Sequence, residues 1–338
     1  MLAPAITATL VAHPDGIARR RCVAFSGAAL DLWARVAFEE LCDEAGLVLL
    51  LAANQALIGF DRGHHAHPKP HHLNTNKGST LSTPDRPVAL ISFAGSYVGP
   101  PLARLLARSG HRLVLHQPSD ALVDELRSAG ADVLAVGAAG AGFMDGTGGL
   151  DTAEGNTALV QAAIDAYGRI DAACLVTGRI VVGRFLKSTI DDWDLVKRAN
   201  LDMVFHGLQS VLPPMLEKQR GQIVVFTSAT GARPEPGVSL YSSTRAGANA
   251  LIRSVGLEHA ADGVTVNAIG TNYMDFPGFA RASGADKSPE QRAKIEAQVP
   301  VRRLGSLDEL AEFTAVLLDG RSRFQTGQFF SYSGGWSA

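Results

Sequence analysis

A serine, a tyrosine and an arginine follow one another at a spacing that suits acid–base chemistry. Ser228 ends an apolar run, Tyr241 follows it by thirteen positions, and Arg245 lies four further on. A tyrosine and an arginine at i and i+4 share one helix face, so both can point at a serine on an adjacent strand end. A fixed cation beside a phenol favours its ionised form, and the phenol can then accept a proton from a substrate hydroxyl that the serine holds.

These three residues need a scaffold that gathers strand ends and helix faces, and the sequence predicts one from Arg86 onward. Short apolar runs alternate there with helical patterns, which is typical of a parallel, doubly wound sheet. We expect strands over 88–92, 112–116, 132–136, 172–176, 222–227, 264–269 and 328–332. We expect helices over 100–108, 120–128, 156–167, 191–218, 239–260 and 307–318. The capping-box pattern Ser306-Leu307-Asp308-Glu309 opens the last helix.

The composition changes near residue 85 and divides the chain of 338 residues. Residues 1–62 read as an N-terminal extension with a helical pattern over 29–44, residues 63–85 as a His/Pro-rich linker, and residues 86–338 as a Rossmann-like catalytic domain. The clustered linker histidines could bind a metal adventitiously, but two prolines and irregular spacing leave no tetrahedral geometry. We therefore expect an α/β protein with a Rossmann-like doubly wound parallel sheet and an N-terminal extension.

Composition excludes several classes of partner. The formal net charge is −2 and the pI is near 6.6, which argues against a nucleic-acid partner. Three widely spaced cysteines, Cys22, Cys42 and Cys174, do not form a disulfide framework, so we expect a reducing, cytoplasmic setting. The best apolar run, residues 47–60, is shorter than the roughly 20 residues of a membrane-spanning helix.

The turn after the first strand lacks the glycines of a dinucleotide site. Those glycines allow a tight turn and let the backbone touch the pyrophosphate. In the turn 92–99, Phe93 and Tyr97 stand at two of the three glycine positions, and only Gly99 remains. The second strand ends in His116 and Gln117, without an acidic residue for a ribose hydroxyl. The glycine-rich segment 137–155 lacks a Gly-Lys-Ser/Thr ending, so we expect it to be a flexible surface loop rather than a phosphate site.

The residues from Arg86 to Ala338 resemble the short-chain dehydrogenase/reductase superfamily, whose members place Ser, Tyr and Lys at this spacing. Arg245 in place of the lysine, with an aromatic residue in the nucleotide turn, resembles the halohydrin dehalogenases. The likeness is strongest over 226–260, 267–279 and 324–338, and segments 86–100 and 201–215 resemble the G-type members. The resemblance implies a cofactor-independent carbon–halogen lyase that converts vicinal halohydrins reversibly to epoxides plus halide. It also implies opening of epoxides, bulky or internal ones included, by azide, cyanide or nitrite.

The same resemblance assigns roles to particular residues. It implies a catalytic triad of Ser228, Tyr241 and Arg245. The implied halide or nucleophile pocket comprises Tyr97, Thr271, Asn272, Tyr273 and Met274. The implied substrate pocket comprises Phe93, Phe276 and Phe279. No cofactor, no metal and no membrane contact are expected, and the resemblance implies a homotetramer.

Two other interpretations of the sequence stay open. One is an NAD(P)-dependent short-chain dehydrogenase/reductase with an unusual nucleotide turn, which a tight nucleotide complex would support. The other is a non-catalytic member of the fold. Asn200, at the position of a helix asparagine that the dehydrogenases use in a proton relay, is retained, although it could simply stabilise its helix.

Overall fold

A seven-stranded parallel sheet forms the centre of the computed structural model, which describes residues 86–140 and 146–337. Its strands are β1 (Val88–Ile91), β2 (Arg112–His116), β3 (Val133–Val136), β4 (Ala172–Val176), β5 (Gly221–Ser228), β6 (Val264–Thr271) and β7 (Phe329–Tyr332). The strand order is β3-β2-β1-β4-β5-β6-β7, and every neighbouring pair is parallel. The order therefore reverses between β1 and β4, which creates a crevice at the carboxyl ends of these strands.

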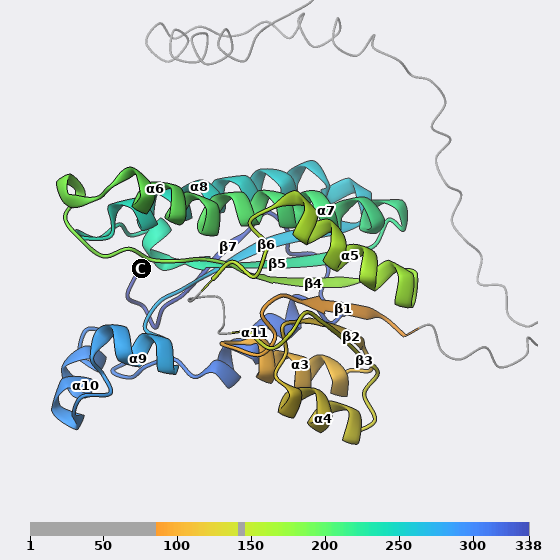
Figure 1. Ribbon diagram of the computed structural model, residues 1–338, viewed down its shortest axis with the longest axis horizontal. Coiled ribbons are helices and arrows are strands. Elements are labelled where there is room, and N and C mark those ends of the chain that lie inside the picture. The colour runs from red at the N-terminus through yellow and green to blue at the C-terminus, as the bar shows by residue number, and fades with distance from the viewer. Residues whose placement is uncertain (1–85, 141–145, 338) are drawn as a thin grey trace, which may run out of the picture. The chain divides into compact units, whose positions relative to one another are not determined.

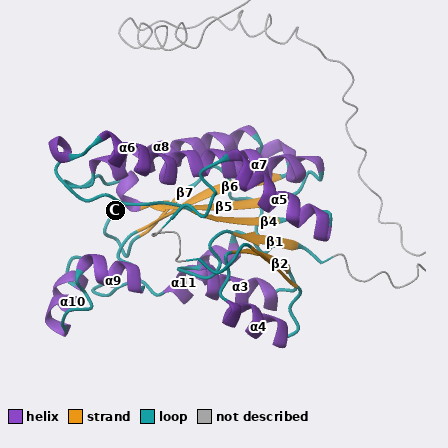
Figure 2. Ribbon diagram, in the orientation of Figure 1, coloured by secondary structure: helices purple, strands orange, loops and turns teal. Residues whose placement is uncertain are grey.

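Helices cover both faces of this sheet (Figures 1 and 2). One layer contains α5 (Ala153–Tyr167), α6 (Ile190–Lys197), α7 (Met203–Glu217) and α8 (Ser239–Glu258). The other contains α3 (Gly99–Arg108), α4 (Asp120–Ser128) and α11 (Leu307–Val316). Because both faces are covered, the central strands are continuous apolar runs rather than alternating ones. The predicted Rossmann-like fold is confirmed.

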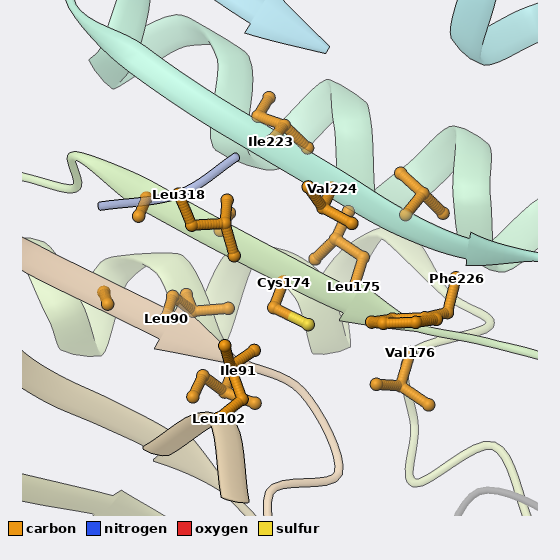
Figure 3. Close-up of a cluster of buried hydrophobic side chains, with 14 of the residues drawn as sticks. Leu90, Ile91, Leu102, Cys174, Leu175, Val176, Ile223, Val224, Phe226 and Leu318 are labelled. Atoms are coloured by element: carbon orange, nitrogen blue, oxygen red, sulfur yellow. The ribbon is translucent and has the colours of Figure 1, made fainter. Parts of the chain in front are cut away.

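The hydrophobic core lies between the central strands and the helices packed on them. Figure 3 shows side chains of β1, β4 and β5 meeting there, with Ile91, Cys174 and Val224 all fully buried. Leu102 of α3 and Leu318, which follows α11, belong to the same cluster. This rigid centre fixes the strand ends that carry the candidate site.

Two regions differ from the sequence-based prediction. The helix expected over 191–218 is interrupted between α6 and α7 by a π-helical turn at Arg198–Asp202, which contains the fully buried Asn200. The segment after β6, where no helix was predicted, forms α9 (Pro277–Ser283) and α10 (Pro289–Glu296). Both short helices begin with proline, which is tolerated in a first turn. The remaining elements predicted from Arg86 onward lie within a few residues of those observed.

Some predictions fall where the structure gives no description. The N-terminal extension, its helix over 29–44 and the histidine-rich linker lie outside the described residues, as does the 141–145 part of the glycine-rich segment. Across 86–140 and 146–337, no helix is long and apolar enough to cross a bilayer. The homotetramer stays a prediction.

The capping box of α11 provides a test of local stability. Ser306 Oγ accepts hydrogen bonds from the amides of Asp308 and Glu309, and the Glu309 carboxylate accepts one from the Ser306 amide. Ser306→Ala should lower the free energy of unfolding by about 1 kcal/mol, because a helix N-terminal donor loses its partner. Urea unfolding followed by circular dichroism measures this, with Ser254→Ala on the exposed face of α8 as control. Equal midpoints for the two variants would contradict the assigned cap.

Candidate active site

A cavity of about 340 Å³ opens at the carboxyl ends of β4, β5 and β6, beside the point where the strand order reverses. It brings together all the expected triad and halide-pocket residues and two of the three expected substrate-pocket residues. These are Tyr97, Ser228, Tyr241, Arg245, Thr271, Asn272, Tyr273, Met274, Phe276 and Phe279. Phe93 is not among the residues that line this cavity.

Helix α8 presents Tyr241 and Arg245 on one face, as their spacing predicts. The guanidinium carbon of Arg245 lies 5.2 Å from the centre of the Tyr241 ring. Arg245 is only 2% exposed, and no carboxylate among the described residues forms an ion pair with it. A buried cation without a counter-charge attracts any negative charge that develops nearby. The arrangement therefore suits a reaction in which the Tyr241 oxygen or a substrate oxygen becomes anionic.

Ser228 ends β5 and is held in a fixed orientation by its neighbours. Its Oγ lies 2.9 Å from Thr230 Oγ1 and accepts a hydrogen bond from the Thr230 amide at 3.2 Å. It also donates a long bond of 3.4 Å to the carbonyl oxygen of Thr271. A substrate oxygen in the cavity can replace this long bond with a better one, so Ser228 is suited to hold an alcohol or a carbonyl.

Tyr97 spans the crevice from the turn after β1 to the end of β6. Its hydroxyl donates to Thr271 Oγ1 at 2.8 Å, and its ring packs edge-on against Phe226 and Phe276, with centroid distances of 5.7 and 5.0 Å. Burial raises the pKa of the Tyr97 phenol well above its ordinary value, so the group stays protonated and acts as a donor. Tyr97 thus forms one wall of the cavity.

Phe93 lies on the other side of the turn and fills the space beside β2. Its ring packs edge-on against His116 at 5.2 Å, and its amide donates to His116 Nδ1 at 3.4 Å. Burial lowers the pKa of His116 to about 4, so this imidazole is neutral at neutral pH. Phe93 is therefore a packing residue of the turn in this structure.

The turn has a backbone conformation that favours glycine, but it carries bulky side chains where a dinucleotide site has glycines. Phe93 and Tyr97 have φ angles of +49° and +51°, a left-handed conformation that favours glycine. The Tyr97 ring, packed on Phe226 and Phe276, lies where a dinucleotide would cross the strand ends, whereas the Phe93 ring packs against His116. A dinucleotide can lie there only if the Tyr97 ring moves away from Thr271.

Two residues that line the cavity were not predicted from the sequence, and two predicted ones have structural contacts of their own. Arg179 and Glu235 line it, and the only signal for Arg179 was its place just after a strand end. Asn200 bonds to the backbone of Arg179 and to Thr244 Oγ1, so its side chain stabilises the loop after β4. Asn272 Oδ1 accepts a hydrogen bond from the Tyr273 amide at 2.9 Å, which is the behaviour of a turn residue.

Acid should destabilise the protein through His116. Its pKa is about 4 in the folded chain and about 6.5 in an unfolded one, so only the unfolded state takes up the proton between these values. The stability from this group is present above about pH 6.5 and falls as the pH drops toward 4, by roughly 3 kcal/mol at most. Unfolding curves at several pH values should show that His116→Gln loses less free energy of unfolding than the wild type as the pH falls. Equal losses in the two proteins would contradict this.

Removing the Tyr97 ring should open the crevice. We expect Tyr97→Gly to bind NADPH or NADH at least tenfold more tightly than the wild type, because the ring and its bond to Thr271 no longer compete with the nucleotide. Isothermal titration calorimetry measures both affinities, with Tyr332→Phe as a control outside this cavity. Wild-type affinity equal to that of Tyr97→Gly would show that the ring does not obstruct the nucleotide.

The chain is similar to known proteins in sequence and in structure. Residues 98–337 match the family described as enoyl-(acyl carrier protein) reductase. The 3-oxoacyl-[acyl-carrier-protein] reductase FabG of Staphylococcus aureus is 28% identical over 253 residues, covering 73% of this chain and 96% of that protein. Oxidoreductase UcpA of Salmonella typhimurium is 32% identical over 250 residues, covering 71% of this chain and 90% of that protein. The crystal structure of gox2181 superposes with a TM-score of 0.65 at 25% identity, covering 75% and 96%.

These relatives overturn the expectation of a halohydrin dehalogenase. They are named reductases and an oxidoreductase, so the predicted cofactor-independent lyase, with its halohydrin, epoxide and halide ligands, is wrong. The resemblance depended largely on Arg245 and on aromatic residues in one turn, whereas the family match extends over residues 98–337. A Ser-Tyr pair beside a cation can move a proton at any alcohol or carbonyl oxygen, so the triad does not by itself select a lyase. The chain belongs to the enoyl-(acyl carrier protein) reductase family, within the short-chain dehydrogenase/reductase superfamily.

Proposed function

We propose that this protein is an oxidoreductase that interconverts a ketone and a secondary alcohol, with Tyr241 as the proton donor and acceptor. The observation that carries the proposal is the convergence on one cavity of Ser228, Tyr241 and the buried Arg245, which forms no ion pair with a carboxylate of the described residues. The names of the relatives support the same class of reaction.

The proton step follows from the positions of these side chains. In the reducing direction, Ser228 donates a hydrogen bond to the carbonyl oxygen, and Tyr241 gives that oxygen a proton as it becomes an alcohol. The phenolate left on Tyr241 is stabilised by the guanidinium of Arg245, 5.2 Å from the ring centre. In the oxidising direction the phenolate takes the proton back from the alcohol.

Reduction also needs a hydride, which a nicotinamide dinucleotide supplies in this superfamily. The Tyr97 ring fills the crevice in this structure, so its bond to Thr271 has to open before a dinucleotide can lie across the strand ends. The energy needed for that opening should weaken nucleotide binding relative to a glycine-rich turn.

The walls of the cavity favour a substrate with apolar substituents. Ile180, Val238, Met274, Phe276 and Phe279 surround the polar centre formed by Ser228, Tyr241 and Arg245. A ketone whose oxygen faces that centre would place its carbon chains on these walls. The relatives named 3-oxoacyl reductases make 3-oxoacyl thioesters the first compounds to test, with simple alkyl ketones beside them.

Replacing the proposed proton donor tests the function directly. Tyr241→Phe should lower turnover about 100-fold or more, because general acid catalysis by this hydroxyl is lost while the ring remains. The assay supplies NADPH and NADH in turn and measures the alcohol product by chromatography.

Tyr167→Phe is the matched control, since its hydroxyl bonds to Asp132 away from the cavity. It should retain wild-type turnover. Full activity in Tyr241→Phe, or no alcohol from the folded wild type with any of these ketones, would refute the proposed function.

A further inference from the structure

We propose that Thr177 and Gly178 are positioning residues that seat the guanidinium of Arg245, and that they allow an arginine to act where the superfamily uses lysine. The effect of these two residues on turnover rests on the proposed function. Both residues follow β4 directly, whereas Arg245 lies 68 positions after Thr177 in helix α8.

Thr177 binds the guanidinium at two points. Arg245 Nη1 donates to Thr177 Oγ1 at 2.8 Å, and Nη2 donates to the Thr177 carbonyl oxygen at 2.5 Å. The Thr177 hydroxyl donates its own proton to the carbonyl oxygen of Phe226 at 3.0 Å, so its lone pairs face Arg245. This two-point contact uses two separate nitrogens held in one plane, which suits the fork of a guanidinium better than the compact ammonium of lysine.

Gly178 makes room for the second nitrogen of the fork. Its φ angle is +124°, a conformation that side chains rarely adopt. A Cβ at this position would overlap Arg245 Nη2 and would lie 2.8 Å from Asn200 Oδ1. The residue therefore has to be glycine for its backbone and also for the space that the guanidinium occupies.

Asn200 holds the far side of the same loop. Its Oδ1 accepts from the Arg179 amide at 3.0 Å, and its Nδ2 donates to the Arg179 carbonyl oxygen at 2.9 Å. The loop is thus fixed between the π-helical turn and Arg245. Arg245 Nε is buried and has no hydrogen-bond partner among the described residues, so the Thr177 contacts and the space at Gly178 largely decide where the charge lies.

Loss of the Thr177 contacts or of the space at Gly178 should affect the chemical step more than substrate binding. In the reducing direction, the cation stabilises the phenolate that forms during proton transfer and is absent from the ground state. Displacing the guanidinium should therefore lower kcat and leave KM nearly unchanged.

Substitutions at Thr177 separate a positioning role from a structural one. Thr177→Val should lower kcat about tenfold, because one hydrogen bond to a charged group is lost, whereas Thr177→Ser should retain most of the activity. Thr314→Val is the control for stability: Thr314 is fully buried in α11 and its hydroxyl donates to Leu310 at 2.7 Å, away from the cavity. Thr314→Val should lower the melting temperature about as much as Thr177→Val does, with kcat unchanged.

A second readout does not depend on turnover. The guanidinium signals of Arg245 can be assigned in a ¹⁵N NMR spectrum by their absence in Arg245→Lys. They should be protected from exchange in the wild type and Thr177→Ser, and the Nη1 signals, which lose their acceptor, should exchange faster in Thr177→Val. Protected signals and unchanged kcat in Thr177→Val would overturn the proposal. If the wild type reduces no ketone, the proposed function fails, and the Arg245 signals alone decide whether Thr177 seats the guanidinium.

The space at Gly178 has its own test. Gly178→Ala should displace the guanidinium and abolish protection of the Arg245 signals. Adding Arg245→Lys should recover part of the lost melting temperature and kcat, since lysine does not occupy the position of Nη2. If the double variant has neither a higher melting temperature nor a higher kcat than Gly178→Ala, overlap with Arg245 is not the reason that position 178 requires glycine.

Discussion

The buried charge of Arg245 is the constraint on which the rest of the site depends. An ion held in the protein interior without a counter-ion costs several kcal/mol unless hydrogen bonds and a nearby negative charge offset it. Here the hydroxyl and carbonyl of Thr177 supply hydrogen bonds, and the Tyr241 ring lies over the guanidinium. The site is therefore most favourable when negative charge appears on the Tyr241 oxygen or on a bound substrate oxygen. A rigid sheet and helix α8 hold these groups in place.

The turn after β1 combines a backbone conformation that favours glycine with two aromatic side chains. Phe93 and Tyr97 keep the left-handed conformation that glycine adopts without strain, at a cost on the order of 1 kcal/mol each. Their rings offset this cost through contacts with His116, Phe226 and Phe276. The contacts with Phe226 and Phe276 hold the Tyr97 ring in the crevice, so Tyr97 forms a wall of the cavity that contains the candidate site.

The sequence was sufficient to predict the sheet, because buried parallel strands are continuous apolar runs that alternate with helical patterns. It also predicted that Ser228, Tyr241 and Arg245 meet, since that follows from helix periodicity and from the edge at which parallel strands end. Helices α9 and α10 were not predicted because they are short and lack a clear apolar face. The seat formed by Thr177 and Gly178 depends on a contact across 68 positions, which no local pattern reveals. The lyase prediction was wrong because it gave a few local residues more importance than the match over 98–337.

A crystal structure of the full chain with a bound secondary alcohol would test the central claim most directly. We expect the alcohol oxygen to lie within hydrogen-bond distance of both Tyr241 Oη and Ser228 Oγ, with the Arg245 guanidinium still hydrogen-bonded to Thr177. An alcohol bound in the cavity with its oxygen away from Tyr241 would contradict it.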